Sequence, residues 1–167
     1  ELKALDWERL DRQLPGWSTW HFQQSITRFV WDPSEAHSGQ YSVAIRENQI
    51  AGCFQAIVPV TPGCRYRLSF WVKQTPADKG GALTVRWKGS QGWADQGADA
   101  VPRLQIPYPW GEKPEWRLVE TTFTAAPTVT HISPLFSAPR QGPDDGIWFD
   151  DIRLVKIFDP AERATRR

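Results

Sequence analysis

The chain has 167 residues, 40% of them apolar, and its 20 basic and 19 acidic side chains give a formal net charge of +1. This length suits one domain with a sizeable core, and so small a net charge creates no field that would gather a polyanion, so we expect no nucleic acid partner. No stretch approaches the roughly 18 consecutive apolar residues of a membrane span, which predicts no membrane insertion.

Tryptophan is unusually abundant in this composition. There are ten tryptophans against eight phenylalanines and three tyrosines. A core of this size needs only a few such rings, so we expect several tryptophans at the surface, where exposed aromatic side chains usually mark a binding site.

From Trp17 onward, apolar residues alternate in short segments that glycine, proline and polar turns separate. Extended segments are predicted at 17–31, 40–46, 53–60, 65–73, 83–88, 116–124, 129–136 and 146–155. Short strands at this spacing with little helix predict an all-β fold, a jelly-roll β-sandwich of two antiparallel sheets.

The clearest alternation lies in residues 65–73. Tyr66 and every second residue after it are apolar and are predicted to face the core, so Trp71 and its polar neighbours face outward. In residues 83–88 the same alternation turns Arg86 outward. An outward tryptophan on a central strand suits a sugar platform, although an exposed tryptophan without a ligand would have the same pattern.

Residues 89–115 form a long passage rich in glycine and proline. Loops of this length inside a compact domain are usually functional or disordered, and large aromatic side chains argue against disorder. The passage is therefore a candidate rim of a binding site, with four candidate ligand-binding residues: Trp93, Gln105, Tyr108 and Trp110.

The segment 146–155 breaks its alternation at Asp150-Asp151. The phase of the apolar residues slips by one position there, which predicts a β-bulge. Two interpretations stay open: the acids face water at a sheet edge, or they bind calcium, which prefers several oxygen ligands.

Catalytic motifs are absent from the sequence. It contains no G-x-S-x-G, no glycine-rich phosphate loop and no H-E-x-x-H, and its adjacent aspartates are not spaced like a glycosidase pair, so we do not expect an enzyme. The three histidines stand alone, which disfavours zinc. Whether Cys53 and Cys64 form a disulfide depends on geometry that the sequence does not give.

Several segments occur in the order found in one known group of proteins. These are Asp6-Trp7-Glu8, Pro15-Gly16-Trp17, His37 to Val43, Pro62 to Lys73, Trp116 to Val119 and Gly146 to Val155. Together they resemble the framework of the β-sandwich carbohydrate-binding modules of families 4, 9, 16 and 22. The resemblance covers residues 1–157 and implies a galactose-binding-domain-like sandwich, followed by a tail or linker at 158–167.

In this group an ion ties the first strand to the last, so the resemblance implies a structural Ca²⁺ held by Glu8, Asp150, Asp151 and the loop at Ser38. It also implies a polysaccharide or oligosaccharide lying across a concave aromatic-lined sheet. We expect a neutral glycan, with Arg86 bonding hydroxyl groups, and keep an acidic glycan as the alternative.

The resemblance further implies a secreted, extracellular or cell-surface module that is tethered to a catalytic or other domain of a glycan-active protein. A structural or protein-contact sandwich without a glycan ligand is the alternative function.

Overall fold

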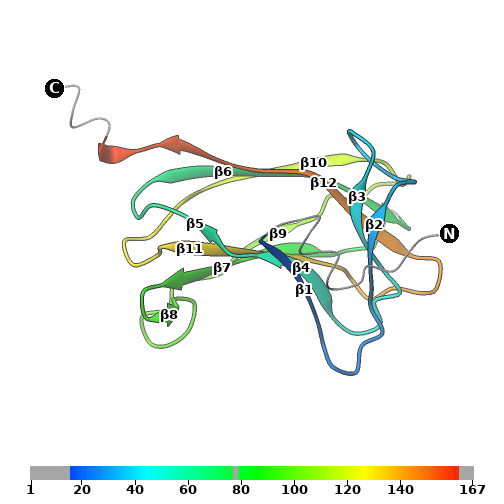
Figure 1. Cartoon of the computed structure of the whole chain (residues 1–167), viewed down its shortest axis with the longest axis horizontal. Coiled ribbons are helices and arrows are strands. Elements are labelled where there is room, and N and C mark those ends of the chain that lie inside the picture. Colours follow the sequence, from blue (N-terminus) through cyan, green and yellow to red (C-terminus); the bar gives the residue numbers. More distant parts are fainter. Residues whose placement is uncertain (1–15, 77–78, 162–167) are drawn as a thin grey trace.

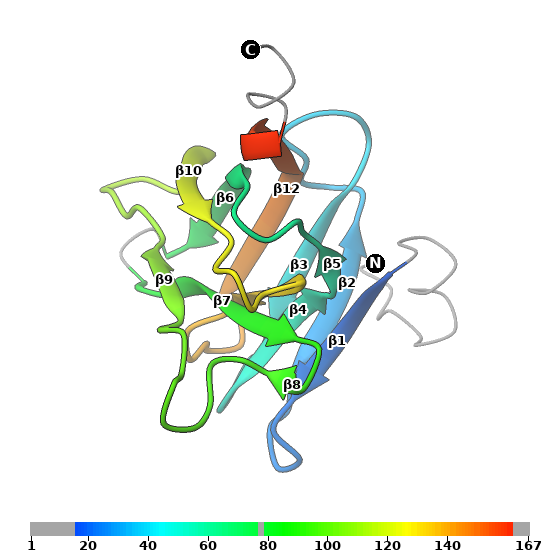
Figure 2. The ribbon, with the colours of Figure 1, turned by 90° about the vertical axis from the view of Figure 1, so that its left-hand side faces the viewer.

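The structure is a computed structural model that describes residues 16–76 and 79–161. Its strands form two antiparallel sheets that lie one above the other (Figures 1 and 2). The predicted all-β sandwich is thereby confirmed. In the described part of the chain no helix is long and apolar enough to cross a membrane.

The five-stranded sheet has the spatial order β10-β6-β12-β3-β2. Its strands are β2 (Arg28–Asp32), β3 (Ser42–Arg46), β6 (Arg65–Thr75), β10 (Arg117–Thr124) and β12 (Gly146–Phe158). The last strand in the sequence therefore lies in the middle of this sheet. It also extends to Phe158, three residues beyond the predicted end at 155.

The seven-stranded sheet has the order β1-β4-β11-β7-β8, with β5 added to β11 and β9 added to β7. Its strands are β1 (Trp17–His21), β4 (Gly52–Ala56), β5 (Val58–Pro59), β7 (Ala82–Gly89), β8 (Gly92–Trp93), β9 (Leu104–Pro107) and β11 (His131–Ser137). The predicted single extended run at 17–31 is wrong, because a turn divides it into β1 and β2, which belong to different sheets. The passage 89–115 contains two short strands rather than loop alone.

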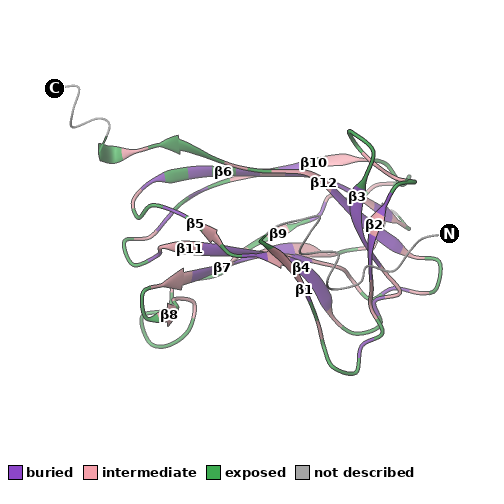
Figure 3. Cartoon of the chain, viewed as in Figure 1, coloured by how far each residue is buried: buried purple, intermediate pink, exposed green. Residues whose placement is uncertain are grey.

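The core lies between the sheets, and Figure 3 shows the buried segments along the strands of both layers. Alternation in β6 follows the prediction: Tyr66, Leu68, Phe70 and Val72 are all buried. The ring of Phe70 lies 5.0 Å from that of Phe136, centroid to centroid, in an edge-to-face arrangement. Such aromatic pairs add to the stabilisation that area burial supplies.

Cys53 and Cys64 are both buried and do not form a disulfide. Burial raises the pKa of the Cys53 thiol to about 12, because a thiolate is poorly solvated there. Cys53 therefore stays protonated at neutral pH, and the fold does not depend on a covalent cross-link between these two residues.

Candidate functional site

The predicted bulge at Asp150-Asp151 is present in β12. The pairing register between β12 and β6 shifts between Asp150 and Arg153, and Asp151 has a φ of 49°. A positive φ is uncommon outside glycine, and aspartate tolerates it better than most residues. The bulge turns two successive carboxylates toward the loop that joins β2 and β3.

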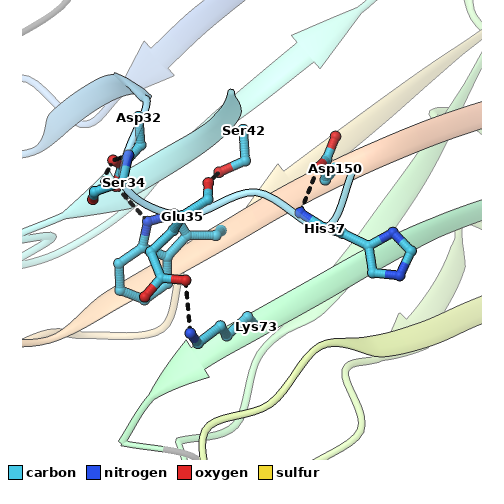
Figure 4. Close-up of polar contacts among 8 residues, drawn as sticks. Asp32, Ser34, Glu35, His37, Ser42, Lys73 and Asp150 are labelled. Carbon is cyan, nitrogen blue, oxygen red and sulfur yellow. Dashed lines mark hydrogen bonds and ion pairs between the residues drawn. The ribbon is translucent and has the colours of Figure 1, made fainter. Parts of the chain in front are cut away.

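This connecting loop, residues 33–41, crosses the outer face of the five-stranded sheet (Figure 4). Glu35 forms an ion pair with Lys73 of β6, with 2.7 Å between Oε2 and Nζ. The backbone N–H groups of His37 and Ser38 donate to Oδ2 of Asp150 at 2.7 and 3.0 Å. The loop joins β2 and β3, and these contacts also fix it to β6 and β12.

Asp151 receives side-chain donors from the same loop. Nδ1 of His37 lies 2.7 Å from Oδ2 of Asp151, and Oγ of Ser38 donates to Oδ1 at 2.7 Å. These hydrogen bonds, with the charges of His37 and Arg153, hold the pKa of the Asp151 carboxyl below its ordinary value of 3.8. The His37 ring also stacks on Trp71, with 3.8 Å between centroids.

The predicted calcium ligands come together only in part. Ser38, Asp150 and Asp151 meet at the bulge, whereas Glu8 lies outside the described residues. Within residues 16–76 and 79–161 no three His, Cys, Asp or Glu side chains are grouped as metal ligands. N–H and O–H donors bond to the Asp150 and Asp151 oxygens, so an ion at the bulge would replace these donors.

Calcium binding stays a prediction, with a direct test. An ion that binds only the folded state raises the melting temperature by mass action, so EDTA should lower it and added Ca²⁺ should restore it. The control is Asp151→Asn, which should no longer respond to either addition. An unchanged melting temperature in EDTA would contradict calcium binding. The hydrogen bonds from the 33–41 loop would then be what stabilises the Asp150 and Asp151 carboxylates.

A small apolar cluster lies beneath this loop, on the outer face of the five-stranded sheet. Trp148 packs there on Val30 and Ala44, with Trp116 against them. Nε1 of Trp148 donates to Oδ2 of the fully buried Asp32 at 2.6 Å. The loop therefore covers one half of this face.

The other half of the face is an open groove of about 410 Å³, which we name the outer groove. Strands β6, β10 and β12 supply most of its lining: Arg67, Ser69, Trp71, Leu118, Glu120, Arg153 and Val155. His37 and Asp151 complete it beside the loop. A groove with an aromatic ring and several polar side chains has the form of a small-molecule or sugar-binding cleft.

The candidate ligand-binding residues from the sequence do not form one site. Trp71 lines the outer groove. Arg86 and Gln105 belong to β7 and β9 of the seven-stranded sheet, on the opposite side of the sandwich. Trp110 is 69% exposed in the segment between β9 and β10 and does not line the groove. These side chains therefore cannot bind one sugar ring together with Trp71.

Tyr108 is a correction, because its side chain is only 1% exposed and cannot present its ring to a ligand. The ring packs edge-on against Phe70 and Phe149 in the core. It passes over Gly81, where an added Cβ would lie 2.9 Å from the ring. Its place in a glycine-rich passage suggested a rim, but the chain folds back into the sandwich at this residue.

Arg86 holds the 89–103 segment onto the seven-stranded sheet. Its guanidinium donates twice to Asp95, at 2.9 and 3.2 Å, and lies 4.0 Å from the centroid of the Trp93 ring. Arg103 also pairs with Asp95, whose side chain is fully buried. The Arg86 guanidinium therefore interacts with both the Trp93 ring and the Asp95 carboxylate, and its partners lie within the protein.

The ion pairs of Asp95 with Arg86 and Arg103 make the stability of the fold depend on pH in the acid range. Burial by itself would raise the pKa of Asp95, but hydrogen bonds from Arg86 and Arg103 lower it below 3.8. A carboxyl with a depressed folded pKa stabilises the fold above pH 3.8, and that contribution is lost as the pH falls through the folded value. Melting temperatures of the parent and Asp95→Asn should therefore differ at pH 6 and converge toward pH 2.

The control for this measurement is Asp99→Asn, an exposed aspartate of the same segment. It should follow the parent at every pH. A difference between the parent and Asp95→Asn that persisted unchanged at pH 2 would contradict the role assigned to the ionised carboxylate.

A second cavity, of about 200 Å³, opens near the bulge from between the sheets. Aromatic side chains line it, among them Trp17, Trp31 and Tyr41. Trp31 and Tyr41 stack on each other at 5.4 Å, and Trp17 packs on Phe136 of the core. These rings therefore largely complete the packing at this end of the sandwich.

Solved structures with this architecture include several binding modules. A family 16 carbohydrate binding module matches with a TM-score of 0.58 and 17% identity, over 77% of this chain and 85% of that one. The C-terminal family 22 carbohydrate binding module of Clostridium thermocellum Xyn10B matches with a TM-score of 0.58 and 11% identity, over 86% and 87%. The chain has the fold of a carbohydrate-binding module.

Other structures that match this chain belong to enzymes. The enzymatically active domain of bacteriophage CBA120 tailspike protein 4 matches with a TM-score of 0.62 and 14% identity, over 86% of this chain but 20% of that one. A Stig cyclase from Fischerella sp. TAU matches with a TM-score of 0.53 and 17% identity, over 84% of both chains. At these identities the likeness shows the fold alone. No family model and no curated protein matches the sequence.

Proposed function

We propose that this chain is a non-catalytic carbohydrate-binding module that holds a polysaccharide or oligosaccharide in the outer groove. The observation that carries the proposal is the position of Trp71. Its ring lines an open groove, on a central strand of a rigid sheet, beside polar side chains that can bond hydroxyl groups. His37 stacks on one face of this ring, so the C–H face of a sugar would stack on the other face.

The rest of the groove supports this assignment. Ser69 and Glu120 are cross-strand neighbours, so a hydroxyl group of a sugar beside Trp71 can bond to both. Leu118 and Val155 add exposed apolar surface. Strand-borne side chains are held more precisely than loop residues, which favours recognition of a repeated and rigid ligand.

Non-catalytic binding agrees best with the acids in the groove. Its carboxylates are Glu120 and Asp151, and Asp151 accepts hydrogen bonds from His37 and Ser38. Glycoside hydrolysis needs two acids that flank one bond and are both available to substrate or water. The xylanase Xyn10B of Clostridium thermocellum carries a family 22 module in one chain with its GH10 module, and by analogy we further propose that this chain is tethered within a secreted, glycan-active protein.

Affinity electrophoresis against a panel of polysaccharides tests the proposal. At least one polysaccharide should retard the parent protein, and Trp71→Ala should migrate faster through it. Retardation by none would favour the alternative, a structural or protein-contact sandwich. Release of reducing sugars from a retained polysaccharide would contradict the non-catalytic assignment.

A further inference from the structure

The outer groove contains two arginines whose guanidinium groups form no hydrogen bond with the described residues. Arg67 and Arg153 are both exposed and both line the groove. Within residues 16–76 and 79–161 neither guanidinium donates a hydrogen bond or forms an ion pair with another side chain. Their situation differs from that of Arg28, Arg86 and Arg117, each of which pairs with a carboxylate.

The strand register brings these two side chains to the same place. Arg67 of β6 lies opposite Val155 of β12, and Arg153 is two residues away from Val155 on the same face. Diagonal neighbours of this kind have Cα atoms about 7–8 Å apart. Two arginine side chains, each longer than half that separation, can therefore reach one ligand group between them.

Ser69 separates this pair from one acid of the groove. It lies opposite Arg153 on one side and opposite Glu120 on the other. The carboxylate of Asp151 already accepts hydrogen bonds from His37 and Ser38, and it also feels the charge of Arg153. The groove is therefore lined by two arginines and two carboxylates, and the two guanidinium groups are left without a hydrogen bond inside the described part of the chain.

Guanidinium groups are the preferred protein partners of carboxylates. Their planar N–H pairs match the two carboxylate oxygens, and such charge-assisted hydrogen bonds are about twice as strong as neutral ones. The two carboxylates of the groove, Glu120 and Asp151, would repel a densely sulfated chain, so the arginines suit a sugar chain with an isolated carboxylate on a ring.

We propose that the outer groove is selective for uronate-bearing glycans, with the carboxylate bound by Arg67 and Arg153 and the neighbouring ring stacked near Trp71. This inference rests on the proposed glycan-binding function and adds the class of glycan. It departs from the neutral ligand expected from the sequence, because the arginine in that expectation, Arg86, is paired on the other sheet.

The test compares tetragalacturonic acid with its fully methyl-esterified form, in which a neutral methyl ester replaces each carboxylate of the same sugar chain. Isothermal titration should give a dissociation constant about tenfold lower for the acid, since a hydrogen bond to a charged group is stronger by that amount. Raising NaCl from about 0.05 to about 0.5 M should weaken binding of the acid more than binding of the ester.

Variants assign the selectivity to individual side chains. Arg67→Gln and Arg153→Gln should each reduce the ratio between the two dissociation constants toward one. Glu120→Gln should increase the affinity for the acid about threefold, because it removes a nearby like charge. The matched control is Arg140→Gln, an exposed arginine outside the groove, which should keep the parent ratio.

The outcomes separate the inference from the function on which it rests. Equal affinity of the parent for acid and ester, or tighter binding of the ester, would overturn the uronate selectivity and leave glycan binding intact. A preference for the acid that both arginine variants retain would also overturn it. If neither tetramer nor any polysaccharide of the panel is bound, the proposed function fails together with the inference.

Discussion

Replacing Trp71 with alanine is expected to weaken polysaccharide binding by about tenfold or more. We take this magnitude by analogy from the stacking of nucleic acid bases on aromatic side chains, which contributes about 1–3 kcal/mol per base. Trp71 lies on β6 with β10 on one side and β12 on the other, so its ring is held by the sheet rather than by a flexible loop. Its stacking partner His37 fixes it further. Binding should be measured by titration with whichever polysaccharide retards the parent.

Two other tryptophans are the matched controls. Trp93 and Trp110 are exposed, at 36% and 69%, but unlike the half-buried Trp71 neither lines the outer groove. Their alanine variants should bind as the parent does, and Trp71→Phe should keep part of the affinity because a ring remains. Circular dichroism and melting temperature establish that each variant is folded. Unchanged binding by Trp71→Ala would place the site elsewhere, with the cavity beside Trp31 as the next candidate.

Replacing Asp32 with alanine is expected to lower the free energy of unfolding by about 3 kcal/mol, since it leaves buried donors unsatisfied. Oδ1 accepts from the backbone N–H and the hydroxyl of Ser34, and Oδ2 accepts from Trp148. Burial would raise the pKa of this carboxyl, but these hydrogen bonds lower it, so Asp32 is ionised at neutral pH. Urea denaturation measures the change.

The control for this substitution is Asp144→Ala, an exposed aspartate in the turn before β12. Its free energy of unfolding should match that of the parent. Asp32→Asn keeps one acceptor and should lie between the two. A loss below about 1 kcal/mol in Asp32→Ala would mean that water replaces the carboxylate, and that the cluster beneath the 33–41 loop is not sealed.

Alternation identified the faces of individual strands correctly, but not their sheets. Trp71 and Arg86 both point outward, as their strands predict. β6 and β7 are consecutive in the sequence yet lie in opposite sheets. The two side chains therefore point to opposite sides of the sandwich. A period of two specifies a face relative to one strand only, and sheet membership depends on pairing with distant segments.

The bulge was predictable because two adjacent acids interrupt an apolar strand, which leaves a local signal. The resemblance implied that the loop at Ser38 lies beside Asp150 and Asp151, but as ligands of a shared ion. It did not predict the direct hydrogen bond from the backbone of His37 to Asp150, 113 residues away. Arg67 and Arg153 were missed for a similar reason. Each is an ordinary outward residue on its own strand, and only the register of β12 against β6 brings them together.

The central position of β12 has a consequence for folding. β6 and β10 form one antiparallel ladder and β2 and β3 form another, and β12 joins the two. Until residues 146–158 are available, β6 and β3 each expose an unpaired edge, the kind of surface that pairs with other chains. The sheet that supports the outer groove therefore assembles only after residues 146–158 have left the ribosome, and chains truncated before β12 are prone to aggregate.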